Sequence, residues 1–143
     1  MKIVQISVFL ENKKGRLYDA TRVLGEAGVD IKALTIAESE KFGVLRMVVD
    51  RPDKALEVLK KSEFVASITD IVAVEVSDRP GGLASVLKIL NDKGINMEYM
   101  YAFVEKNADN AIVVFRFDDP DKAIKVLAGS NIRVLGKKEI QGF

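Results

Sequence analysis

The chain has 143 residues, 48% of them hydrophobic and 30% charged, a composition typical of folded globular proteins that excludes disorder and collagen. Its 22 Lys and Arg residues against 21 Asp and Glu leave a net charge of +1, so no overall field attracts nucleic acid or an anionic membrane. The sequence has no Cys and no His, which removes disulfides, thiolate nucleophiles, imidazole bases and nearly all zinc or copper sites. Asp, Glu, Lys, Tyr and the backbone remain for chemistry. We expect no metal and no cofactor, and we expect small molecules or proteins as partners.

The N-terminal apolar run, residues 3–10, predicts a strand. Gln5 and Ser7 interrupt it, and no small-residue cleavage pattern follows, which argues against a leader peptide. No stretch of the sequence approaches the roughly 20 apolar residues that a membrane span requires. We expect a cytoplasmic protein.

An internal repeat organises the chain. Residues from about 3 to 38 match those 66 positions later, so that Gly15 and Gly28 recur as Gly81 and Gly94. Further along, the offset becomes 68, and the run Pro-Asp-Lys-Ala at 52–55 recurs at 120–123. The repeat predicts two domains, residues 1–69 and 70–143.

Hydrophobic periodicity gives both halves the same order: strand, helix, strand, strand, helix, strand. In the first half the predicted elements cover residues 3–10, 17–27, 30–38, 42–50, a helix from Pro52 onward, and 64–69. In the second half they cover residues 71–76, 83–90, 95–104, 111–118, a helix from Pro120 onward, and 132–140. Gly28 and Gly94 are predicted to end the first helix of each half, and each Pro suits a first helical turn. The fold class is therefore α+β: two tandem ferredoxin-like βαββαβ units, each an antiparallel four-stranded sheet with helices on one face.

Only Asp70 separates the last strand of the first unit from the first strand of the second. One residue spans about 3.5 Å, whereas neighbouring strands lie about 4.8 Å apart. We therefore predict that residues 64–76 form one long element, shared by both units, that would hold them rigidly.

The third strand of each unit is apolar on both faces. Its inward set is Leu45, Met47, Val49, Val113, Phe115 and Phe117. Its opposite face still shows Val44, Val48, Ile112 and Val114. Because exposed apolar patches usually mark association, this face predicts a homodimer or sheet-to-sheet packing. Tyr99, Tyr101 and Phe103 also share one face of a strand, where they form either an aromatic wall for a ligand or, as we favour, a packing surface.

The first connection of each unit, residues 11–17 and 77–83, ends a strand and opens a helix. Glycine there lets a ligand approach the backbone, and the free N–H groups of a helix start can hold a carboxylate. The alternative is a plain capping turn in which Asn12 or Asp78 bonds the local amides.

The run Asp78-Arg79-Pro80-Gly81-Gly82-Leu83, a helix with Leu87 and Leu90, and Gly94-Ile95-Asn96-Met97 leading into a strand together resemble the ACT domain, the regulatory module of amino-acid metabolism. The first half resembles it more weakly through Asn12, Gly15, Leu17 and Gly28-Val29-Asp30-Ile31, without the Pro-Gly pair. The resemblance covers nearly the whole chain as two tandem copies. It implies the βαββαβ fold and brings no catalytic residue.

ACT domains bind amino acids or related effectors between paired domains, near the first loop and the start of the second strand. The resemblance implies these ligand-binding residues in the second unit: Asp78, Arg79, Pro80, Gly81, Gly82, Leu83, Asn96 and Met97. In the first unit it implies Asn12, Lys13, Gly15, Arg16, Leu17, Asp30 and Ile31. The amides of residues 81–83 would accept the α-carboxylate, and Asn96 or a loop carbonyl would meet the α-ammonium. We favour the second unit, because Lys13, Lys14 and Arg16 replace the Arg-Pro-Gly-Gly run in the first.

The leading hypothesis is a non-catalytic sensor that binds a free amino acid and modulates a partner enzyme of amino-acid metabolism or its own assembly. One alternative is an effector-free assembly module. A small enzyme using carboxylates or Lys is the other, and the lack of His removes its commonest general base. Binding of single-stranded RNA on the sheet lacks the basic surface and the glycine-aromatic signature that it requires.

Overall fold

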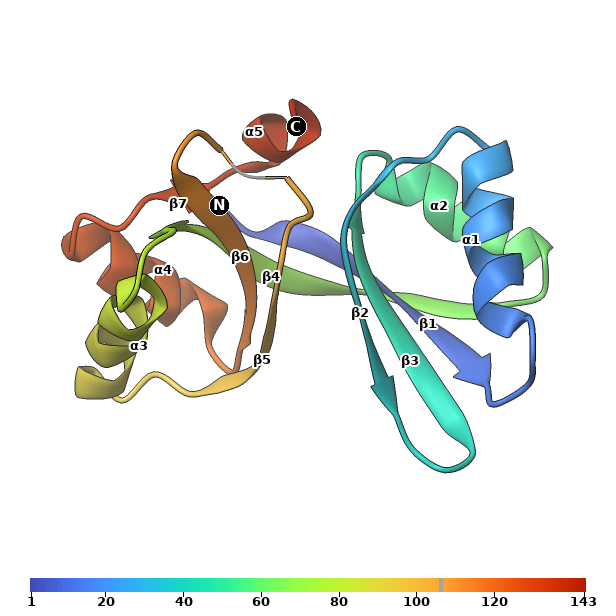
Figure 1. The fold of residues 1–143 in the computed structure, drawn as a ribbon, viewed down its shortest axis with the longest axis horizontal. Coiled ribbons are helices and arrows are strands. Elements are labelled where there is room, and N and C mark those ends of the chain that lie inside the picture. Colours follow the sequence, from blue (N-terminus) through green and yellow to red (C-terminus); the bar gives the residue numbers. More distant parts are fainter. Residues whose placement is uncertain (106) are drawn as a thin grey trace. The chain divides into compact units, whose positions relative to one another are not determined.

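The computed structural model describes residues 1–105 and 107–143, and its contacts divide the chain into two compact units (Figure 1). The N-terminal unit comprises residues 4–69, and the C-terminal unit comprises residues 1–3 and 70–143. The first elements in chain order are β1 (Ile3–Glu11), α1 (Arg16–Glu26), β2 (Ile31–Glu38), β3 (Phe42–Val49), α2 (Pro52–Lys61) and β4 (Val65–Ser77). They are followed by α3 (Gly82–Asp92), β5 (Met97–Ala102), β6 (Asn110–Phe117), α4 (Pro120–Gly129), β7 (Val134–Leu135) and α5 (Lys137–Gln141).

Both units have the strand order of the ferredoxin-like fold. The order is β2-β3-β1-β4 in the N-terminal unit and β7-β4-β6-β5 in the C-terminal unit. Helices α1 and α2 cover one face of the first sheet, and α3 and α4 cover one face of the second (Figure 1). This arrangement confirms the fold class predicted from the repeat.

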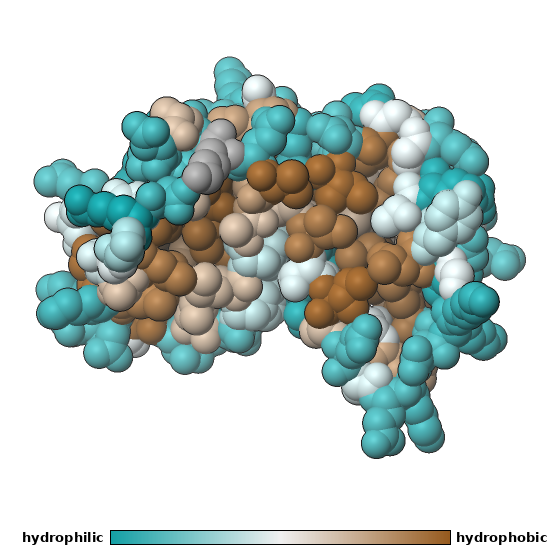
Figure 2. Space-filling view, in the orientation of Figure 1, coloured by the Kyte–Doolittle hydropathy of each residue, from teal (hydrophilic) through white to brown (hydrophobic). Residues whose placement is uncertain are grey.

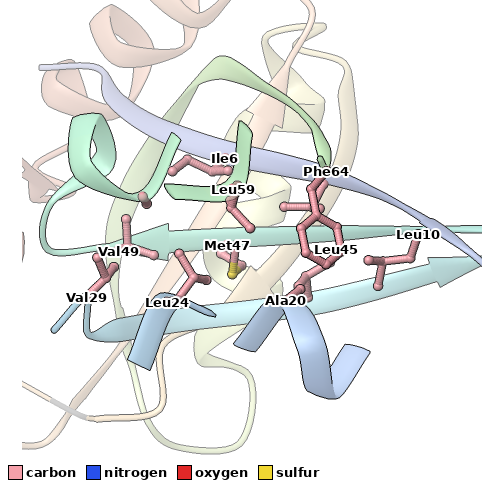
Figure 3. Packing of buried hydrophobic residues seen from close by; sticks show 12 residues of the cluster. Ile6, Leu10, Ala20, Leu24, Val29, Leu45, Met47, Val49, Leu59 and Phe64 are labelled. Carbon is pink, nitrogen blue, oxygen red and sulfur yellow. The ribbon is translucent and has the colours of Figure 1, made fainter. Parts of the chain in front are cut away.

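Each unit has its own hydrophobic core between its sheet and its two helices. In the N-terminal unit, Leu45 and Met47 of β3 meet Leu24 of α1 and Leu59 of α2 (Figure 3). In the C-terminal unit the stacked rings of Phe115 and Phe117, with centroids 5.3 Å apart, occupy the corresponding strand. The inward set of side chains predicted from alternation is therefore confirmed.

The helix ends follow the local signals in the sequence. Gly28 and Gly94 adopt left-handed φ values of 72° and 67° just beyond α1 and α3. Pro52 and Pro120 open α2 and α4, where a missing N–H costs nothing. Asp119 caps α4 by accepting a 3.1 Å hydrogen bond from the amide of Lys122.

Strand β4 runs without interruption from Val65 to Ser77 across the boundary between Thr69 and Asp70, which confirms the single long element. The strand predicted over residues 132–140 is wrong in its second part. Only Val134 and Leu135 pair with β4, and the chain then turns into α5. Gly136 begins that helix, and the carboxylate of Glu139 accepts a 3.2 Å hydrogen bond from its amide.

The outer sheet face is less open than the sequence suggested. Val48, Ile112 and Val114 are at most 2% exposed within a single chain. The homodimer stays a prediction. Among the helices of the described residues, none is long and apolar enough to cross a membrane.

Candidate functional site

A small pocket lies beside the first loop of the N-terminal unit. Its volume is about 120 Å³, roughly four times the share of one water molecule in the liquid. Four residues predicted from the sequence line it: Asn12, Lys13, Arg16 and Leu17. The rest of its lining comes from the ends of β1 and β2 and the start of β3: Leu10, Glu11, Ile36, Glu38, Ser39, Phe42 and Gly43.

Helix α1 begins at this pocket with unused hydrogen-bonding capacity. Gly15 is its N-cap, with a left-handed φ of 90° and no side-chain cap. In the described part of the chain, the amides of Leu17 and Tyr18 have no backbone acceptor, as expected in a first helical turn. The pocket therefore adjoins the positive end of a helix dipole.

Arg16 adds a cation to the same pocket. Its guanidinium carbon lies 4.2 Å from the centre of the Phe64 ring, a cation–π contact that fixes the side chain. Its Nε is buried and has no hydrogen-bond partner, and its contact with Asp19 is long at 4.0 Å. The Nε–H itself is out of reach of a ligand, but the side chain as a whole is 31% exposed, so the rest of the guanidinium can attract an anion.

Lys13 and Asn12 are already engaged. The ammonium of Lys13 lies 2.9 Å from Glu11, and this hydrogen bond and charge lower the pKa of the Glu11 carboxyl. Asn12 donates a 3.0 Å hydrogen bond to the carbonyl of Glu40 in the β2–β3 turn. Asn12 therefore fastens the loop to that turn and does not cap α1, which excludes for Asn12 the capping role considered from the sequence.

The corresponding loop of the C-terminal unit is built differently. Gly82 is buried, and a Cβ there would lie 2.0 Å from the carbonyl oxygen of Ser77, so only glycine fits. Its amide donates to the carbonyl of Arg79 at 3.0 Å, which removes it from the set of amides predicted to hold a carboxylate. Gly81 is the N-cap of α3 with a φ of 84° and no side-chain cap. Asp78 donates its own amide to the carbonyl of Asp109.

A second pocket, of about 300 Å³, adjoins this loop. Arg79 and Gly82 are the two predicted residues that line it. Its other lining residues are Glu75, Ser77, Ser85, Val86, Asn110, Asn131, Ile132 and Arg133. Among the remaining predicted residues of this unit, Leu83 and Met97 pack against the hydrophobic core.

The start of the second strand lies far from the first loop of the same unit. In the N-terminal unit Glu11 pairs with Phe42, whereas Ile31 pairs with Val49, seven residues further along β3. At about 3.4 Å per residue this separation is about 24 Å. The C-terminal unit has the same separation along β6, so within either unit the two predicted parts of the ligand site are not brought together.

The polar residues just before β2 and β5, Asp30 and Asn96, bond to residues just after the neighbouring strands β3 and β6. The amide of Asp30 donates to the carboxylate of Asp50 at 2.9 Å, and the amide nitrogen of the Asn96 side chain donates to Asp118 at 2.7 Å. Asp30 also forms an ion pair with Lys32 at 2.9 Å. Both residues thus have structural partners, and their role in ligand binding stays a prediction.

The aromatic residues of β5 behave as packing residues. The register pairs Tyr99 with Arg116 and Tyr101 with Val114, which places both tyrosines on the face away from α3 and α4. Tyr101 and Phe103 are buried, and the Phe103 ring meets the ring of Phe143 edge to face, with centroids 6.1 Å apart. No pocket described above includes them.

Sequence reasoning missed Phe42 and Ile36 in the first pocket and Glu75 and Arg133 in the second. Phe42 and Ile36 could have been found from the hairpin, because the register places the end of β2 and the start of β3 beside the end of β1. Glu75 and Arg133 carried no local motif. Over residues 1–105 and 107–143, no group of three or more acidic side chains is arranged to hold a metal ion.

A family model described as an ACT domain pair matches residues 1–143. The chain belongs to the ACT domain pair family. The structure of protein BT0572 from Bacteroides thetaiotaomicron is 41% identical in sequence, with a TM-score of 0.93, and the match covers 100% of this chain and 98% of that one. No curated protein matches the chain.

More distant structures share the ACT pair fold. The ligand-free regulatory subunit of aspartate kinase from Thermus thermophilus is 17% identical, with a TM-score of 0.63, over 90% of this chain and 92% of that one. The corresponding subunit from Thermus flavus is 16% identical, with a TM-score of 0.60, over 89% and 91%. At these identities the likeness establishes the fold alone.

Proposed function

We propose that this ACT domain pair is a regulatory protein that binds a free amino acid at the first loop of its N-terminal unit and modulates a partner or its own assembly. The observation that carries the proposal is the first-loop pocket of the N-terminal unit, where the partly exposed guanidinium of Arg16 and the start of α1 offer donors to a carboxylate. Leu17 and Ile36 supply apolar contact for a side chain. The pocket favours the N-terminal loop over the C-terminal loop that the sequence favoured.

A homodimer is part of the proposal, because β2 is an open edge of its sheet. Leu34 and Ile36 on β2 are 40% and 37% exposed, and the surface over β2 and β3 is apolar in this view (Figure 2). Antiparallel pairing of β2 with β2 of a second copy over the full length of both strands would place the copy's Ile31 opposite Glu38. The start of one second strand would then lie beside the first-loop pocket of the other copy, which unites the two separated parts of the predicted site.

The partner that we propose is an enzyme of amino-acid metabolism. The Thermus proteins that share this fold are regulatory subunits of aspartate kinase, which supports this class of partner. To regulate a partner, the amino acid must bind two states of the protein with different affinities, because equal binding shifts no equilibrium.

The test is a thermal-shift screen of the purified chain against the twenty amino acids. A ligand at 100 times its dissociation constant adds about 2.7 kcal/mol to the stability. We expect a shift with one or a few amino acids that Arg16→Gln abolishes and Lys14→Gln, an exposed change in the same loop, leaves intact. Each variant is compared with its own unliganded melting temperature. A flat screen would favour the effector-free assembly module.

Light scattering at micromolar concentration tests the dimer. We expect twice the chain mass, reduced toward a monomer by Leu34→Lys at the open edge. A monomeric mass for the unchanged protein would refute the homodimer without excluding amino-acid binding.

A further inference from the structure

The 300 Å³ pocket of the C-terminal unit has a lining rich in hydrogen-bond donors. It lies between the end of β4, the first turns of α3 and the segment just before β7. It shares Arg79 and Gly82 with the first loop, and none of its walls comes from β5, where the second part of the predicted amino-acid site begins. It is therefore a site of different composition from the one proposed above.

The one carboxylate of this pocket is already satisfied. The Glu75 side chain is 12% exposed and forms an ion pair with Arg133 at 3.1 Å. It also accepts hydrogen bonds from the side chains of Asn107 and Asn110. A ligand ammonium would have to compete with these three donors, which makes a cationic ligand unfavourable here.

The pocket has more hydrogen-bond donors than its own acceptors engage. Arg79 is exposed and, over the residues that the structure describes, makes no ion pair. Arg133 uses one N–H on Glu75 and one on Glu139, out of the five that a guanidinium carries. Asn131 adds an amide, and it is held with a left-handed φ of 59° at the pocket wall. Such a set of donors suits a ligand that brings negative charge and acceptors.

The repeat shows that the fold itself does not require this pocket. By the offset of 66, Gly82 corresponds to Arg16 in the N-terminal unit, where the side chain extends over the ring of Phe64. By the offset of 68, Phe64 corresponds to Ile132, which lines the C-terminal pocket. The N-terminal unit thus places an arginine side chain over the residue equivalent to Ile132, where the C-terminal unit has only Gly82.

We propose that the C-terminal pocket binds a small oxyanion, a carboxylate or phosphate group of a metabolite, between Arg79 and Arg133. Two arginines that line one pocket are suited to the planar or tetrahedral oxygens of these groups. Glu75 and Glu139 hold Arg133 in position from either side. The proposal does not depend on amino-acid binding at the N-terminal loop.

The experiment is isothermal titration calorimetry of the full chain with sodium phosphate and with sodium succinate, at an ionic strength held constant with potassium chloride. We expect binding of one probe at concentrations up to about 10 mM. A response to phosphate alone identifies a phosphate site, and a response to succinate alone identifies a carboxylate site. Failure of both probes overturns the proposal.

Matched variants locate the binding in the C-terminal pocket. Arg79→Gln should weaken it about tenfold, the scale of one charge-assisted hydrogen bond, whereas Lys13→Gln at the equivalent N-terminal position should not. Asn131→Gly keeps the left-handed backbone and removes the amide, and Glu63→Gly, with a φ of 66°, is its counterpart. If the two variants of either pair weaken the binding equally, the proposal is overturned. Asn131→Gly should leave any amino-acid thermal shift unchanged, so the two proposals fail independently.

Discussion

The two units share one fold but carry opposite chemistry at three equivalent positions of their sheets and adjoining turns. In the N-terminal unit these positions are exposed and apolar: Phe9, Phe42 and Val65. In the C-terminal unit they form a polar network: Glu75, Asn110 and Arg133. The rings of Phe9 and Phe42 meet at 5.9 Å, whereas Glu75 and Arg133 form an ion pair at 3.1 Å.

The difference shows which positions of a duplicated unit can change their side chains while the fold is kept. Inward positions of the strands are apolar in both units, because each must fill a core between sheet and helices. The three differing pairs of positions lie outside these two cores, where the chemistry of one unit does not constrain the other. Arg16 and Gly82, which are equivalent, give one unit a cation over an aromatic ring and the other a close backbone contact.

The largest expected effect concerns the C-terminal segment, which has no helical counterpart in the N-terminal unit. Ile140 of α5 is 3% exposed, so Ile140→Ala should lower the free energy of unfolding by about 3 kcal/mol. The same change at Ile68 of β4, which is 57% exposed, should cost less than about 1 kcal/mol. Urea unfolding measures both. Similar costs would mean that α5 does not pack as described.

Next is the glycine of the C-terminal loop. Gly82→Ala would place a Cβ 2.0 Å from the carbonyl oxygen of Ser77, and we expect a loss of about 2 kcal/mol from the resulting strain. Gly25→Ala in α1 meets open space at an ordinary helical position, so it should stabilise by about 0.5 kcal/mol. Thermal unfolding shows whether each change raises or lowers the stability. A neutral Gly82→Ala would show that the two loops tolerate side chains equally.

The secondary structure and the candidate site differ in how far the sequence could predict them. The order βαββαβ, the long β4 and the glycines after α1 and α3 all follow from periodicity and local backbone preferences, which operate over a few residues. The helix at residues 137–141 was missed because the repeat suggested a strand like β4, whereas Gly136 and the Glu139 cap end the pairing. In the candidate site, Arg16 and Leu17 were predicted, but Glu75 and Arg133 were not, because residues 58 positions apart meet only through strand pairing.

Glu75 offers a direct test of the polar network. Glu75→Ala should leave Arg133, Asn107 and Asn110 without their shared acceptor and cost about 1–2 kcal/mol of stability. Phe9→Ala, at the equivalent and half-exposed N-terminal position, should cost less than about 1 kcal/mol. Urea unfolding at neutral pH compares them. If Phe9→Ala proves the more costly, the N-terminal aromatic pair contributes more than the C-terminal ion pair does.

The smallest effect is electrostatic and distinguishes the two first loops. The hydrogen bond and charge of Lys13 lower the pKa of Glu11, while the equivalent of Glu11 in the C-terminal unit is Ser77, which carries no charge. A carboxyl whose pKa is lowered by folding stabilises the protein at neutral pH, and this contribution is lost as the pH falls through the folded value. NMR titration should show the Glu11 carboxyl below its ordinary pKa, and Lys13→Gln should raise that pKa toward the ordinary value of a Glu carboxyl. An ordinary Glu11 pKa in the unchanged protein would mean that Lys13 is not held by Glu11 and is available to a ligand. In that case the N-terminal loop would offer a cation to an anion, as the C-terminal loop does with Arg79.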